Sequence, residues 1–296
     1  MSSLQARTVL ITGAARGIGA ETARHLSRAG ARLVLVDLDE VGLKSLVSEL
    51  DSDDVLAVTA DVCDLDGMEA AVARGLERFD GIDVVLANAG IASYGSVLAV
   101  DPATFKRVID INLLGVFHTV RAALPSVIEN KGYVLVVSSM AAFGAMAGLA
   151  SYNASKAGVE HFANALRLEV KHLGVDVGVA HMSWIDTPLV RDARNDLTAF
   201  GRMIATLPYP MNKTTSVEAC GRAFVAGIAA RKRRVFVPGW VALAAATRTL
   251  LNSRVAELGA LRHIPALLPL MDEEVRRLGR STSLRNVELS EQIADR

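Results

Sequence analysis

Residues 8–19 read Thr-Val-Leu-Ile-Thr-Gly-Ala-Ala-Arg-Gly-Ile-Gly. The first four are β-branched or apolar, as in a buried strand, and a helical apolar pattern continues from the last glycine to about Ala29. Glycines in such a turn let the backbone approach a phosphate, to which the helix N-terminus offers N–H groups and positive dipole. A glycine-rich turn alone is a weak signal, but its place between strand and helix favours a nucleotide-binding unit.

The alternation of strand and helix continues to residue 237. Six further apolar runs are predicted strands, at 32–36, 55–60, 83–87, 133–137, 175–180 and 234–237. They are continuously apolar rather than alternating, which is typical of a parallel sheet covered on both faces. We therefore predict an α/β, doubly wound Rossmann-type domain over residues 1–238, with a loop from Trp184 to about Thr215. Residues 239–296 are expected to form an extension, helical at first and then flexible.

Composition excludes several function classes. The 296 residues are 51% hydrophobic and carry 32 basic and 32 acidic side chains, so bulk charge indicates no nucleic-acid partner. Two cysteines are too few for a disulfide framework. The chain enters a strand-like run without a signal peptide, so we expect a cytoplasmic protein. The uncharged stretch 132–155 is broken by glycines and serines, and we interpret it as protein interior rather than a membrane span.

The pair Tyr152 and Lys156 carries the candidate chemistry. Four residues apart near a helix start, the two side chains share one helix face. A tyrosine titrates near ~10, and a neighbouring ammonium lowers that pKa toward the range of proton transfer. Ser139, after a buried strand, can hydrogen-bond a carbonyl or alcohol oxygen. Taken alone, a Tyr-x-x-x-Lys sequence fits a surface pair equally well.

Asp37 stands at the end of the second predicted strand, about twenty residues beyond the glycine turn. A carboxylate there suits a bidentate contact to the hydroxyls of an adenosine ribose. A helix-capping aspartate is the alternative.

Seven motifs in order resemble those of the short-chain dehydrogenase/reductase family over residues 6–238. They are Thr12-Gly-x-x-x-Gly17-Ile-Gly19, Asp61-Val62, Asn88-Ala89-Gly90, Asn112, Ser139, Tyr152-x-x-x-Lys156 and Ile185-Asp186-Thr187-Pro188. One of them would be suggestive, and seven together indicate the family.

The resemblance implies a role for each matching residue. Tyr152 would be the general acid/base, Ser139 would hold the substrate oxygen, and Lys156 would lower the pKa of the tyrosine. Asn112 would kink its helix and hold a water in a proton relay. The implied cofactor-binding residues are Gly13, Arg16, Gly17, Ile18, Gly19, Asp37, Asp61, Val62, Asn88, Ala89, Gly90, Tyr152, Lys156, Ile185 and Thr187.

The sequence departs from the family pattern after the sixth strand, where His181-Met182-Ser183 replaces the usual Asn-Pro-Gly. This puts the path of the chain beside the nicotinamide in doubt. We interpret His181 as a hydrogen-bonded loop histidine. The histidines form no cluster at ligand spacing with carboxylates or thiols, so no metal is expected.

The leading hypothesis is an oxidoreductase that transfers hydride between NAD and a lipophilic secondary alcohol or ketone, such as a steroid, terpenoid or acyl-chain compound. Tyr94, Phe143 and Met146, together with Ser139, are the candidate substrate-binding residues. Asp37 would repel the 2′-phosphate of NADP, whereas Arg16 would attract it. An NADP-dependent ketone or 3-oxoacyl reductase is therefore the runner-up. A catalytically silent nucleotide-binding regulator or membrane-surface protein is the alternative of another class.

The resemblance also implies an assembly, a homodimer or homotetramer through the helices that carry Asn112 and Tyr152. Residues 231–296 hold 12 basic and 7 acidic residues, with short apolar segments between the arginines. This extension could fold over the cleft, pack on another subunit or lie on a membrane surface. Beyond Met271 the chain is charged, and we expect it to extend into solvent.

Overall fold

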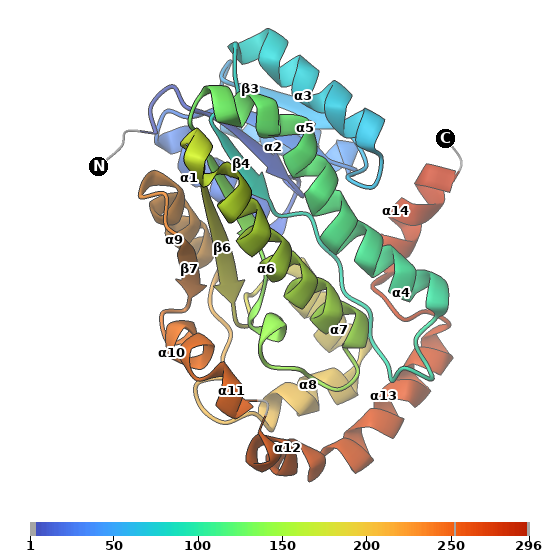
Figure 1. Cartoon of the computed structure of the whole chain (residues 1–296). Helices are drawn as coiled ribbons and strands as arrows, with labels where there is room; N and C mark the ends of the chain where they lie inside the picture. The colour runs from blue at the N-terminus through green and yellow to red at the C-terminus, as the bar shows by residue number, and fades with distance from the viewer. Residues whose placement is uncertain (1–3, 252, 295–296) are drawn as a thin grey trace.

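Seven parallel strands form one sheet in the order β3-β2-β1-β4-β5-β6-β7 (Figure 1). The structure, a computed structural model, describes residues 4–251 and 253–294. The strands are β1 (Thr8–Thr12), β2 (Arg32–Asp37), β3 (Val55–Thr59), β4 (Val84–Ala87), β5 (Tyr133–Val137), β6 (Asp176–Met182) and β7 (Arg234–Val237). The strand order reverses between β1 and β4, where open α/β sheets bind their ligands. The predicted doubly wound fold is confirmed.

Helices cover both faces of the sheet. One face carries α1 (Gly17–Arg28), α2 (Glu40–Leu50) and α9 (Val217–Ala229), and the other carries α3 (Leu65–Phe79), α5 (Gly115–Glu129) and α6 (Ala150–Val170). In β1, Val9 and Ile11 pack with the first group, and Leu10 packs with the second. Both faces of the central strands are thus buried, which explains their continuous apolar runs, whereas the outer strands β3 and β7 are partly exposed.

A long helical stretch, Pro102–Glu129, is the one candidate in the described part of the chain that is long and apolar enough to cross a membrane. It comprises α4 (Pro102–Ile109), a π-helical turn (Asp110–Leu114) and α5. Val116, Val120, Ala123 and Val127 recur at helical spacing and are buried in the core on this side of the sheet. We therefore interpret the stretch as a core helix.

The loop predicted from Trp184 to Thr215 is wrong in part, because it contains α7 (Pro188–Asp196) and α8 (Thr198–Ala205). Ala199, Phe200, Met203 and Ile204 of α8 are buried in a third cluster with Met271 and Val275 of α13 (Ile264–Leu278). The helix is stabilised by a segment more than sixty residues away, which no local pattern reveals.

The expectation that the chain extends into solvent after Met271 is also wrong. The extension forms α10 (Val241–Ala246), α11 (Arg248–Leu251), α12 (Arg254–Leu261), α13 and α14 (Leu284–Ala294) (Figure 1). Of these, α13 packs on α8, and α14 lines the cleft described below. The charged residues here make specific contacts. Glu274 is buried, and its carboxylate accepts the N–H groups of Thr198 (3.1 Å) and Ala199 (3.0 Å) at the start of α8. A carboxylate at a helix N-terminus is stabilised by the helix dipole.

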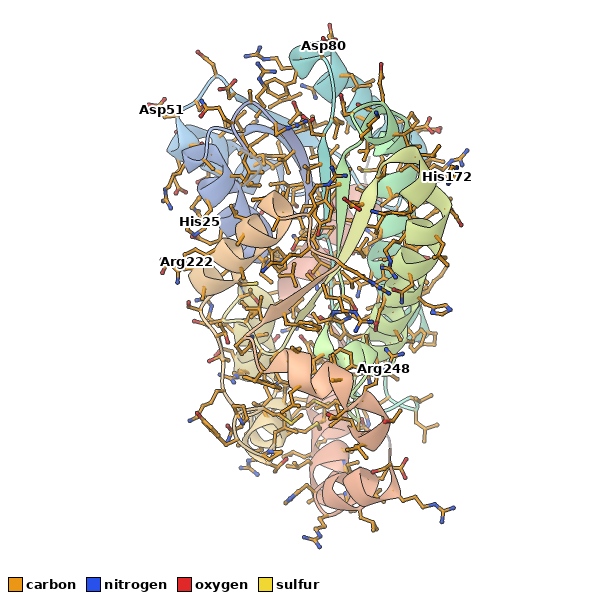
Figure 2. The ribbon with its side chains drawn as sticks, turned by 60° about the vertical axis from the view of Figure 1, so that its left-hand side comes forward. His25, Asp51, Asp80, His172, Arg222 and Arg248 are labelled. Carbon is orange, nitrogen blue, oxygen red and sulfur yellow. The ribbon has the colours of Figure 1, made fainter. Side chains whose placement is uncertain are left out.

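The extension also joins the helix that carries the tyrosine and lysine. Arg248 Nη1 lies 3.3 Å from Glu160 Oε1 of α6. In Figure 2, Arg248 lies in the lower half of the molecule, whereas Asp51 and Asp80 lie near its top. Leu243, Leu250 and Leu258 of the extension are exposed. A membrane-surface role for these leucines stays a prediction, which pelleting with anionic liposomes would check.

Candidate active site

A single cleft runs along the carboxyl ends of β1, β2, β4, β5 and β6. Most of the predicted site residues line it. These are Gly13, Arg16, Gly17, Ile18, Asp37, Asp61, Val62, Asn88, Ala89, Gly90, Tyr94, Ser139, Tyr152, Lys156, Ile185 and Thr187. Residues scattered over 175 positions of the sequence thus meet at the point where the strand order reverses.

The glycine turn is shaped for close backbone approach. Gly13 has a φ of +65°, and a Cβ there would lie 2.8 Å from Ala89 Cα. A Cβ at Gly19 would lie 2.1 Å from the carbonyl oxygen of Gly13, far inside van der Waals contact. The turn therefore presents bare backbone to the cleft at the start of α1. This arrangement fits the pyrophosphate of a dinucleotide.

The segment after β4 is tied to this turn. Asn88 Nδ2 donates to the carbonyl oxygens of Thr12 (3.0 Å) and Gly13 (3.1 Å). A Cβ at Gly90 would lie 3.2 Å from Asn112 Oδ1 and 3.4 Å from Lys156 Nζ. The absence of a side chain at Gly90 thus lets the loop lie against Lys156, the candidate catalytic lysine.

Asp37 is the last residue of β2 and lines the cleft. Its Oδ2 accepts the N–H of Ala15 (2.8 Å), and its Oδ1 accepts the N–H of Asp39 (3.0 Å). Burial raises the pKa of Asp37, while these two N–H groups act to lower it. The carboxylate is therefore fixed in orientation, as a group that reads two ribose hydroxyls must be.

Asp61 has a partner that the sequence did not reveal. Its Oδ2 lies 3.0 Å from Nη2 of Arg107, and its Oδ1 accepts the N–H of Cys63 (2.9 Å). Arg107 lines the cleft from α4. The spacing of 46 residues between the two offers no motif by which to find the pair.

Ser139 and Tyr152 lie within hydrogen-bonding contact at the base of the cleft. Burial raises the pKa of Tyr152, and the hydrogen bond with Ser139 acts against that rise. Lys156 Nζ lies 5.6 Å from the centre of the Tyr152 ring and donates to the carbonyl oxygen of Val137 (2.9 Å). Burial also lowers the pKa of Lys156 to about 8. Ser139 thus acts to lower the pKa of the tyrosine, whereas the lowering by Lys156 that the resemblance implies stays a prediction.

Asn112 is fully buried in the π-helical turn. Its Oδ1 accepts the N–H of Ile91 (2.9 Å), and its Nδ2 donates to the Ile91 carbonyl oxygen (2.9 Å) and to Ser155 Oγ (3.0 Å). The side chain thus ties the loop after β4 to α6, which positions Tyr152. The water relay implied by the resemblance stays a prediction.

His181 lies in β6, so its interpretation as a loop histidine is wrong. The strand extends through Met182, which pairs with Val237 of β7. His181 Nε2 lies 3.5 Å from Glu160 Oε2, and its ring stacks on Phe236 at 5.6 Å. Without the proline and glycine that usually follow the sixth strand, the strand continues two residues further than predicted.

The three candidate substrate residues separate in the structure. Tyr94 lines the cleft and donates a long hydrogen bond to the Leu189 carbonyl oxygen (3.4 Å). Phe143 and Met146 are not among the described residues that line it. The ring of Phe143 packs against that of His181 instead, with the ring centres 5.3 Å apart. Met146 packs in the cluster around α8. Other apolar side chains line the cleft instead, namely Ile91, Met182, Leu189 and Val190.

The far side of the cleft comes from the C-terminal extension. Ser283, Asn286, Leu289 and Ser290 line the cleft together with Asp37. The sequence analysis missed these residues, because a polar stretch behind a charged helix resembles a solvent-exposed tail.

Comparison with known proteins agrees with this geometry. A model of the short chain dehydrogenase family matches residues 7–198. An NAD-dependent oxidoreductase of Mycobacterium tuberculosis, described as uncharacterized, is 33% identical over 205 residues, which are 64% of this chain and 74% of that protein. The (−)-trans-carveol dehydrogenase of Rhodococcus erythropolis is 34% identical over 209 residues, which are 65% of this chain and 76% of that enzyme.

Among solved structures, the 3-ketoacyl-(acyl-carrier-protein) reductase of Brucella melitensis complexed with NADH superimposes with a TM-score of 0.72. It is 28% identical, and the match covers 79% of this chain and 98% of the reductase. The family model covers well over half of the chain, and residues of six of the seven motifs line one cleft, while Asn112 is buried behind it. The chain therefore belongs to the short-chain dehydrogenase family.

Proposed function

We propose that this oxidoreductase transfers hydride between NAD and a lipophilic secondary alcohol or ketone. The observation that carries the proposal is the convergence of Ser139, Tyr152 and Lys156 in the cleft whose other end holds Asp37 and the glycine turn. A bound nicotinamide dinucleotide supplies the hydride acceptor in oxidation and the donor in reduction. A protein that merely bound the nucleotide would have no need of a buried tyrosine paired with a serine.

Each side chain of the catalytic group has a distinct task. Ser139 donates a hydrogen bond to the substrate oxygen, and Tyr152 takes the alcohol proton in oxidation or returns it in reduction. Lys156 stays protonated at neutral pH because its pKa is about 8. Its ammonium favours the phenolate when the proton leaves the tyrosine. Asn112 keeps α6 fixed against the loop after β4, and so keeps Tyr152 in register with Ser139.

An apolar substrate is favoured by the side chains around the reacting oxygen. Ile91, Met182, Leu189 and Val190 surround this end of the cleft, and they offer no charged group to a polyol or sugar phosphate. The carveol dehydrogenase among the relatives supports a terpenoid-like alcohol. The 3-ketoacyl reductase neighbour supports the alternative of an acyl-chain ketone.

We expect purified protein to oxidise lipophilic secondary alcohols with NAD and to bind NADH more tightly than NADPH. Asp37 is fixed and partly buried, so a 2′-phosphate placed beside it would be repelled more strongly than Arg16 attracts it. A panel of cyclic and acyl-chain alcohols with each cofactor, together with fluorescence titrations, tests both statements. Tighter NADPH binding would favour the NADP-dependent reductase. Turnover of small polyols alone would contradict the substrate class.

We also expect a homodimer or homotetramer formed through the face of α5 and α6. Leu114, Phe117 and Leu168 are large apolar side chains exposed on this face, and Phe117 packs 6.3 Å from Phe162 of α6. Sedimentation of the 31.4 kDa chain at micromolar concentration should give a dimer or larger species. Phe117→Glu should shift it toward monomer, whereas the control Leu258→Glu on α12 should not. A monomeric wild-type chain would contradict the expectation.

A further inference from the structure

The C-terminal helix forms a wall of the cleft that the strands and the glycine turn do not supply. Asn286 and Ser290 of α14 are four residues apart, so they share one helix face, and Ser283 directly precedes the helix. All three, with Leu289, line the cleft. We propose that α14 is part of the adenosine-binding site and slows the release of the cofactor. This inference rests on the proposed NAD-dependent function.

A buried anchor fixes the start of this wall. Ser281, Thr282 and Ser283 are all buried. The N–H of Tyr94 donates to the Ser281 carbonyl oxygen (2.7 Å), and Thr282 Oγ1 donates to the Ala92 carbonyl oxygen (2.8 Å). The anchor therefore joins the extension to the loop after β4, which also carries Asn88 and Gly90.

An ion pair holds the other side of the wall. The Arg285 guanidinium contacts the Asp39 carboxylate, whose Oδ1 accepts the Gly42 N–H (3.0 Å) at the start of α2. The Asp39 side chain is 9% exposed and that of Arg285 is 41% exposed, so the pair is partly shielded from water. The ion pair thus joins α14 to the turn between β2 and α2, two residues from the proposed ribose-binding Asp37.

The charged side chains at the proposed adenosine end of the cleft interact with one another. Burial lowers the pKa of Arg16, the positive charge of Arg285 lowers it further, and Asp37 and Asp39 act in the opposite direction. Two guanidiniums therefore face two carboxylates around the proposed adenosine ribose. A second hollow between α14 and the same turn is lined by Leu38, Asp39, Arg285 and Leu289. This hollow and the ion pair place α14 beside the turn that follows Asp37, at the proposed adenosine end.

Ending the chain after Ser283 tests the wall directly, because the buried anchor stays and α14 is removed. We expect the dissociation constants of NADH and ADP-ribose to rise about tenfold or more, a change of about 1.4 kcal/mol. Most of the change should appear as faster release of NADH in stopped-flow fluorescence. The maximal turnover should stay within about twofold while the KM for NAD rises, since the reacting groups are untouched.

Two point variants isolate the ion pair without shortening the chain. Arg285→Ala and Asp39→Asn should each weaken NADH binding by about threefold to fivefold, as expected for a partly shielded pair. The asparagine keeps an oxygen for the Gly42 N–H, so the start of α2 is preserved. Their effects should not add in the double variant. Arg277→Ala, at an exposed arginine of α13, is the control and should bind NADH as the wild type does.

The outcomes separate this inference from the proposed function. Unchanged affinity and release rate in the shortened chain and in both point variants, with wild type that binds NADH, would overturn the role of α14. Wild type that binds neither NADH nor ADP-ribose would overturn the proposed function itself. Melting temperatures of all variants show whether they are folded, and the point variants decide the matter if the shortened chain is not.

Discussion

Tyr152→Phe should reduce turnover by on the order of 10²-fold or more, the range expected when a general acid/base is lost. The substitution keeps the ring, which packs among buried apolar side chains, and removes just the hydroxyl group. Affinity for NADH should stay within about threefold, because the cleft keeps its shape. Steady-state kinetics on a verified alcohol, with a separate fluorescence titration of NADH, measures the two quantities. Near-normal turnover would remove the proposed mechanism.

The cleft holds a matched control for this variant. Tyr94→Phe removes a hydroxyl group from the same cleft, where it makes one long hydrogen bond to Leu189. It should reduce turnover by less than about tenfold. Lys156→Ala, in contrast, should damage both turnover and cofactor affinity, since this ammonium serves the tyrosine and borders Gly90.

The pH dependence of kcat/KM gives a second test of the role of Tyr152. Oxidation of the alcohol needs the phenolate, so kcat/KM should rise with pH until Tyr152 has lost its proton. Because burial raises the pKa of Tyr152, that rise should extend above neutral pH. Tyr152→Phe should abolish the rise. A variant profile that keeps the same rise would assign it to another group.

The fold could be predicted because both faces of the sheet are covered. Val9, Leu10 and Ile11 are all apolar for this reason, and the same pattern marks each strand. Two elements could not be predicted in this way. The apolar face of α8 is buried by α13. The last residues of β6 belong to the strand because they pair with β7. Both depend on partners distant in the sequence, which local propensity does not register.

The candidate site also contains some residues that local sequence patterns predict and others that depend on distant partners. Some site residues end or follow a strand, or lie in the first turns of a helix, so the topology of the sheet alone brings them to one edge. These are Gly13, Asp37, Ser139, Tyr152 and Lys156. Arg107 and the residues of α14 reach the cleft because helices fold back over it, and nothing in their local sequence indicates that path. Phe143 was misplaced for the opposite reason. It follows Ser139, the candidate catalytic serine, closely, but the short helical turn at Met140–Ala142 directs it toward His181.

Among substitutions that add one methyl group at the cofactor end of the cleft, Gly19→Ala should be the most damaging. Its Cβ would lie 2.1 Å from the carbonyl oxygen of Gly13 and 2.9 Å from Asn88 Nδ2. Neither neighbour can move freely, because Asn88 Nδ2 bonds the carbonyl oxygens of Thr12 and Gly13, and backbone cannot rotate away as a side chain can. The turn must shift as a unit, at a cost of about 1–3 kcal/mol of stability.

The shift should appear mainly in cofactor affinity, since it displaces the N–H groups that would meet the pyrophosphate. We expect the dissociation constant of NADH to rise by on the order of 10²-fold, about 2.7 kcal/mol. Gly201→Ala in α8 is the matched control, because a Cβ there meets nothing within 4 Å. An alanine inside a helix is favoured over glycine by about 1 kcal/mol, so the control should melt at the same or a higher temperature. If Gly19→Ala binds NADH as tightly as Gly201→Ala does, the glycine turn does not hold the pyrophosphate, and the cofactor must enter the cleft in another orientation.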